Sequence, residues 1–208
     1  MIVASLGFTQ SDFRVFEIEG FSARMEQIGA RIRPRLTRLG AELAPELARK
    51  LHMKFFPHVA KHMRRTVNPP AETWAAWGPS PKGYKRYGYL SLCISRLGIH
   101  ARVVVKAEAD NRAEMARRIA AQSATLAKAM RGTKIARYDR WDFVAMPEEI
   151  GADQGFFAAM SEALAKKTGA IDAGFGWPVR EALRIDRAEV IDAFGELEPV
   201  YRILRSVA

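Results

Sequence analysis

The chain has 208 residues, of which 49% are hydrophobic and 27% are charged, and its formal net charge is +10 at pH 7. These proportions are typical of a soluble globular protein, and no apolar run approaches the roughly 20 residues that cross a bilayer, so we expect no membrane-spanning helix. The first residues do not resemble a secretory signal, and the single cysteine, Cys93, cannot form an internal disulfide, so we expect a cytoplasmic protein.

The charge is unevenly distributed along the chain. Residues 1–138 contain 25 Lys and Arg against 10 Asp and Glu, whereas residues 139–208 contain 8 against 13. A basic segment of this size attracts phosphate-bearing molecules, nucleic acids included. The same charge is also compatible with solvated arginines on helix faces, or with pairing between the basic part of one copy and the acidic part of another.

Helical spacing dominates the first 51 residues. Segment Thr9–Phe16 predicts a short helix that begins with a capping box, formed by its first residue and the aspartate three positions later. From Ser22 to Leu51, apolar residues recur every three or four positions, which predicts a long helical segment. Pro34 and Pro45 interrupt the hydrogen bonding of that segment, so we expect either a kink near Pro34 or two helices divided near Gly40.

The middle of the chain has the character of β-strands. Segments 55–60 and 73–77 each predict a strand. The strongest pair is 87–95 with 99–107, because apolar and β-branched residues flank a three-residue connection that ends in Gly98. We predict a hairpin at this connection.

After residue 110 the patterns predict helices at 111–131, 153–168 and 187–206. They predict strands at 135–141 and 171–179. The strand at 171–179 is expected to close the sheet, and the last helix to break or kink near Pro199. We therefore predict one α+β domain over residues 1–208, with a mainly antiparallel sheet packed against helices on one side.

The stretch from His58 to Arg86 is the least like an ordinary core pattern, because it combines histidines, cations and aromatic residues around a Pro-Pro break. Lysine and arginine pair with phosphate, and aromatic rings stack on bases for about 1–3 kcal/mol per base. The candidate ligand-binding residues are Lys61, Arg64, Arg65, Trp77, Lys82, Tyr84, Lys85 and Arg86. For Trp77, burial in the core competes with stacking, and for the arginines, internal ion pairs compete with ligand contact.

His58 and His62 stand four residues apart and are candidates for general acid or base catalysis. Zinc sites use three or four protein ligands, and no third ligand stands at a recognisable spacing, so we predict no metal site. The sequence contains no phosphate-binding loop, dinucleotide-binding loop or nucleophile elbow, and we expect no cofactor.

Four segments, residues 8–28, 32–40, 58–77 and 82–86, resemble the YktB-like conserved bacterial family. The longest of them reads HVAKHMRRTVNPPAETWAAW. The resemblance is dense over the first half of the chain. It implies a single α+β domain, and it brings no catalytic residues to carry over.

These residues support three hypotheses about function. The first is a binding module for an anionic, phosphate-bearing ligand, either a nucleotide or RNA, on a basic surface lined with aromatic residues. The second is a small enzyme in which His58 or His62 is the general acid or base and Arg64 or Arg65 holds an anion. The third is a protein-interaction domain or homodimer assembled through complementary charge. No membrane partner is expected.

Overall fold

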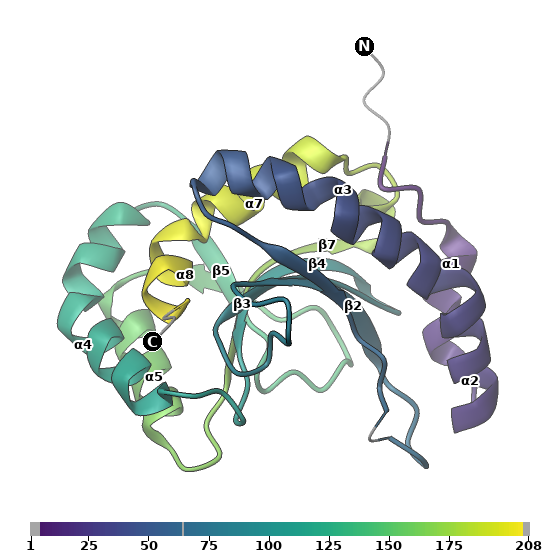
Figure 1. Cartoon of the computed structure of the whole chain (residues 1–208), viewed down its shortest axis with the longest axis horizontal. Helices are drawn as coiled ribbons and strands as arrows, with labels where there is room; N and C mark the ends of the chain where they lie inside the picture. The colour runs from purple at the N-terminus through teal and green to yellow at the C-terminus, as the bar shows by residue number, and fades with distance from the viewer. Residues whose placement is uncertain (1–4, 64, 206–208) are drawn as a thin grey trace.

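The computed structural model describes residues 5–63 and 65–205, and within them a seven-stranded sheet has the order β1-β2-β3-β4-β7-β5-β6 (Figure 1). The strands are β1 (Phe56–Val59), β2 (Glu72–Gly78), β3 (Tyr89–Ser95), β4 (Gly98–Val105), β5 (Lys134–Arg137), β6 (Glu149–Gly151) and β7 (Ile171–Pro178). All their pairings are antiparallel. The hairpin predicted at Gly98 is confirmed, because β3 pairs with β4 across that connection.

The helical elements in chain order are α1 (Gln10–Arg14), the 3-10 turn η1 (Val15–Glu17), α2 (Phe21–Gln27), the π-helical turn η2 (Ile28–Ile32), α3 (Arg33–Leu51), α4 (Arg112–Ala129), α5 (Gln154–Ala165), α6 (Val179–Ala182), α7 (Arg187–Glu196) and α8 (Glu198–Leu204). Figure 1 shows α3 and α7 above the sheet and loops beneath it. The predicted class, an α+β fold with an antiparallel sheet against helices, is confirmed. No helix in the described part of the chain has the length and apolarity of a membrane span.

The N-terminal helices follow the sequence pattern closely. Thr9 and Asp12 form the predicted capping box of α1. The segment predicted from Ser22 to Leu51 is continuous through α2, η2 and α3, so the alternative of two helices divided near Gly40 is wrong. The π-helical turn lies immediately before Pro34, as expected where a proline removes a helical hydrogen bond and the backbone adjusts locally.

Two strands differ from the sequence expectation. β7 lies inside the sheet between β4 and β5, and does not close it as predicted. The short edge strand β6 was not predicted, because three exposed residues carry no hydrophobic alternation. The predicted break near Pro199 is confirmed, since α7 ends at Glu196 and α8 begins at Glu198.

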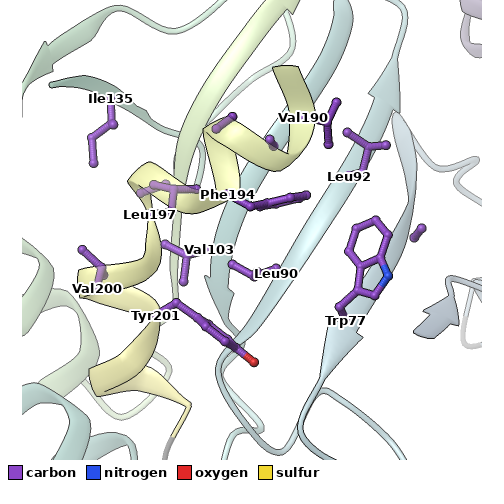
Figure 2. Packing of buried hydrophobic residues seen from close by; sticks show 14 of the residues in the cluster. Trp77, Leu90, Leu92, Val103, Ile135, Val190, Phe194, Leu197, Val200 and Tyr201 are labelled. Atoms are coloured by element: carbon purple, nitrogen blue, oxygen red, sulfur yellow. The ribbon is translucent and has the colours of Figure 1, made fainter. Parts of the chain in front are cut away.

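The core lies between the sheet and the helices. Trp77, Leu90 and Val103 point from the strands towards Phe194 and Tyr201 of the two C-terminal helices (Figure 2). Strand residues alternate between the two faces of a sheet, so the neighbours of these apolar residues along each strand point the opposite way. That opposite face, which we call the open face, carries the candidate site.

Candidate functional site

The open face has an arginine near its centre. Arg102 of β4 lies opposite Ser91 of β3 on one side and Gly174 of β7 on the other. These small neighbours leave space for the guanidinium group, which lies over the ring of Tyr138 at 4.9 Å from its centroid. Only 1% of Arg102 is exposed, and a charge buried to this extent requires partners.

The partners of Arg102 are two carboxylates. One terminal guanidinium nitrogen is 2.5 Å from Glu72 Oε2, and the other is 3.2 Å from Asp172 Oδ2. Lys106 Nζ lies 3.5 Å from the same oxygen of Asp172. We call Glu72, Arg102, Lys106 and Asp172 the charge network. It contains two positive and two negative groups, so its formal charge is balanced.

The charge network shifts the ionisation of its members. Burial would lower the pKa of Arg102, but Asp172 and Glu72 outweigh this effect and hold it well above its usual value. Burial raises the pKa of Asp172, against the opposing influence of Arg102 and Lys106. Burying charged groups costs at least as much desolvation free energy as their mutual attraction provides. Such a network is therefore not expected to be present mainly to stabilise the fold. Its position in a cavity makes it a candidate functional site.

A pocket of about 870 Å³ opens onto this face, and Glu72, Lys106 and Asp172 line it. This volume lies within the range of small-molecule sites, about 300–1,000 Å³. Aromatic side chains contribute to its wall: Trp74, Tyr84, Tyr138 and Phe143. We call the exposed cations Lys61, Arg65 and Lys82 the rim of the pocket, and the two carboxylates Glu72 and Asp172 its inner end.

Most of the predicted ligand-binding residues converge on this pocket. Its lining includes Lys61, Arg65, Lys82, Tyr84 and Lys85. Arg86 is not among the lining residues, and its guanidinium pairs with Asp110 at 2.7 Å. Arg64 lies outside the described residues.

Trp77 requires a correction. Its side chain is fully buried on the helix side of the sheet, where the indole nitrogen donates a hydrogen bond to the carbonyl of Gly40 at 2.9 Å. It offers no surface on which a ligand could stack. Trp74, three residues earlier in β2, lines the pocket instead, because an odd spacing along a strand places two side chains on opposite faces.

The two candidate histidines have different surroundings. His58 Nε2 donates a hydrogen bond to the Ser80 carbonyl at 3.0 Å, and His58 does not line the pocket. His62 lines it, with Nε2 at 3.0 Å from the Thr73 hydroxyl and its ring against Trp74. Burial, aided by nearby cations such as Arg65, lowers the pKa of His62 to about 4. His62 is therefore neutral at pH 7 and lacks the imidazolium proton that a general acid would donate.

His100 is a buried histidine to which the sequence analysis gave no role. Its Nε2 lies 3.1 Å from the Ser95 hydroxyl, and its ring packs against Tyr138 and Trp141. Its Nδ1 is buried without a hydrogen-bond partner. Within the described residues, no group of three or more His, Cys, Asp or Glu side chains could hold a metal ion, so His100 does not belong to such a cluster.

We expect acid to weaken the fold through His100. Burial lowers the pKa of His100 well below its usual value of 6.5, so the unfolded chain takes up the proton more readily than the folded chain as the pH falls. Stability from such a group is present above the unfolded pKa and is lost as the pH falls below it. The loss between pH 6.5 and 5 is at most about 2 kcal/mol.

Urea unfolding at pH 7 and pH 5 measures this loss. Between the two pH values, a His100→Asn variant should lose less free energy of unfolding than the wild type, by up to about 2 kcal/mol. Equal losses in both proteins would show that His100 is not the group responsible.

The fold and the pocket together define an α+β protein with a cavity, lined by charged and aromatic side chains, on the open face of an antiparallel sheet. The chain belongs to the family described as a domain of unknown function, DUF1054, whose profile matches residues 8–201. This membership is consistent with the resemblance seen in the sequence.

Relatives of this chain are UPF0637 proteins of other bacteria. The protein of Bacillus velezensis is 44% identical over 90 residues, which cover 43% of each chain. That of Lysinibacillus sphaericus is 38% identical over 114 residues, 55% of this chain and 54% of the relative. That of Staphylococcus haemolyticus is 36% identical over 107 residues, which cover 51% of this chain and 53% of the relative. The matched stretch thus spans about half the length of these relatives.

Proposed function

We propose that the protein binds a small phosphate-bearing ligand of the nucleotide class in the pocket of the open face. The observation that carries this proposal is the meeting of free cations and aromatic rings in one concave space. Lys61, Arg65 and Lys82 line the pocket, and none of them forms an ion pair within the described residues. Arginine and lysine with free donors are the side chains that pair with phosphate.

The aromatic wall suits a planar base. The indole nitrogen of Trp74 donates to the Tyr84 hydroxyl at 3.1 Å, and Tyr84 packs edge-on against Tyr89. Both Trp74 and Tyr84 are partly exposed in the pocket. Rings that the protein already holds in place lose little conformational freedom when a ligand stacks on them.

The charge pattern favours a small ligand over a nucleic-acid strand. A long polyanion needs a continuous track of free cations. Here Lys85 and Lys106 each lie near a carboxylate, at 3.7 Å from Glu108 and 3.5 Å from Asp172. Among the described cations that line the pocket, those without a carboxylate partner are therefore Lys61, Arg65 and Lys82 of the rim.

Isothermal titration with nucleoside monophosphates at low salt tests the proposal. We expect Lys61→Ala and Lys82→Ala each to weaken binding about tenfold, because each removes one charge-assisted contact to phosphate worth roughly 1.4 kcal/mol. Raising the salt concentration should weaken binding in the wild type, since the rim is exposed and its charges are screened.

Lys128→Ala is the matched control, because Lys128 is an exposed lysine of α4 that does not line the pocket. Its affinity should equal that of the wild type. The proposal is wrong if no nucleotide binds at low salt, or if the control loses as much affinity as the rim variants.

A further inference from the structure

We infer that the pocket selects nucleotides whose base carries an exocyclic amino group, and that Glu72 accepts a hydrogen bond from this group. The inference rests on the proposed function, since it specifies the ligand of the same pocket. Its basis is the pair of carboxylates at the inner end, which the sequence did not single out.

Glu72 is a fixed acceptor with one oxygen to spare. Arg102 holds Oε2 at 2.5 Å, and the side chain of Glu72 is 15% exposed. The other oxygen, Oε1, makes no hydrogen bond within the described residues. An ionised carboxylate can only accept hydrogen bonds, so this oxygen presents an acceptor to whatever enters the pocket.

Asp172 gives the inner end a second unsatisfied acceptor. Its Oδ2 faces both Arg102 and Lys106, whereas its Oδ1 is buried without a hydrogen-bond partner. A buried acceptor without a partner costs about 1–3 kcal/mol. Because Oδ1 itself is closed to solvent, Asp172 contributes negative charge to the inner end, and the acceptor that a ligand can approach is that of Glu72.

The spacing of Glu72 and Trp74 fits a base that stacks on Trp74 and hydrogen-bonds Glu72 through its edge. They are two residues apart in β2, on the same face, which separates them by about 6.6 Å along the strand. The same face therefore presents both an aromatic ring and a carboxylate acceptor to one ligand. The exposed cations of the rim remain available for its phosphate.

Amino groups distinguish the bases at such an edge. Cytosine, adenine and guanine carry an exocyclic amino donor, whereas uracil has a carbonyl acceptor where cytosine has its amino group. Carboxylates read the cytosine amino group in this way in nucleic-acid complexes, and a good polar pair discriminates by about 1–3 kcal/mol. A site built for a donor rejects an analogue without it, because its own acceptor is left unpaired.

Two matched pairs of ligands test the inference on the wild-type protein. CMP and UMP differ in the group at the fourth ring position, and GMP differs from IMP by one amino group. Isothermal titration should show CMP binding at least about tenfold more tightly than UMP, and GMP more tightly than IMP by a similar factor. Equal affinities within both pairs would overturn the inference and leave the proposed function standing. Absence of binding by all four would overturn both.

The variant Glu72→Gln tests the assigned residue. Its amide offers a donor as well as an acceptor, so the preference for CMP over UMP should fall to about twofold or less. Glu108→Gln is the control, because Glu108 also lines the pocket but is exposed and pairs with Lys85. The control should keep the wild-type preference. If a folded Glu72→Gln variant kept the wild-type preference for CMP over UMP, Glu72 would not be the residue that recognises the amino group. The wild-type comparison decides the ligand class even if that variant does not fold.

Discussion

Replacing Arg102 by methionine should lower the free energy of unfolding by about 3–5 kcal/mol. Methionine has a comparable length and no charge, so the change leaves Glu72 and Asp172 facing each other at the inner end. Asp172 would keep Lys106 at 3.5 Å, but Glu72 would have no cation to replace the one now at 2.5 Å. The cost is that of uncompensated buried charge, which exceeds the net worth of the original pair. Urea unfolding at pH 7 measures it.

Arg86→Met is the matched control. Arg86 also pairs with a carboxylate, Asp110, at 2.7 Å, but its side chain is 71% exposed. Exposed pairs of this kind contribute about 1 kcal/mol or less. A third variant, Arg102→Met combined with Glu72→Gln and Asp172→Asn, should recover part of the loss, because it removes the uncompensated charges. If Arg102→Met costs no more than Arg86→Met, the charge network is not buried as described.

The sequence was a reliable guide to the elements whose periodicity is local. The capping box of α1, the hairpin at Gly98 and the break near Pro199 each depend on residues within a few positions of one another. The position of β7 in the sheet does not depend on such local residues. Its pairing with β4 joins residues about 70 positions apart, and no local pattern specifies which strand a buried segment will lie beside.

The candidate site divides in the same way. The rim residues Lys61, Arg65 and Lys82 lie close together in the sequence, so the sequence alone predicts that they cluster. The sequence does not predict the charge network, because Arg102 and Asp172 meet only through the pairing of β4 and β7. A signal was nonetheless present: Arg102 stands inside the most strongly predicted hairpin, where a charged residue has to find a partner or a function.

Replacing the two tryptophans of β2 by alanine should affect different properties: Trp77→Ala mainly stability, and Trp74→Ala mainly nucleotide affinity. Trp77 is fully buried, packs edge-on against Phe194 and bonds the Gly40 carbonyl, so Trp77→Ala should cost about 3–5 kcal/mol of unfolding free energy. Trp74→Ala removes a partly exposed ring on the open face and should cost about 1 kcal/mol. Its larger effect should be on nucleotide affinity, with a loss of about 1–3 kcal/mol of stacking.

Urea unfolding and isothermal titration on both variants separate the two faces of the sheet. Trp77→Phe controls for the loss of the indole hydrogen bond, since it keeps most of the buried ring and should retain most of the stability. If Trp74→Ala proved as destabilising as Trp77→Ala and left nucleotide binding intact, Trp74 would be a core residue and the pocket would lack its stacking wall. Because the two residues stand at an odd spacing in one strand, only one of them can face the pocket, and the charge network on the open face identifies it as Trp74.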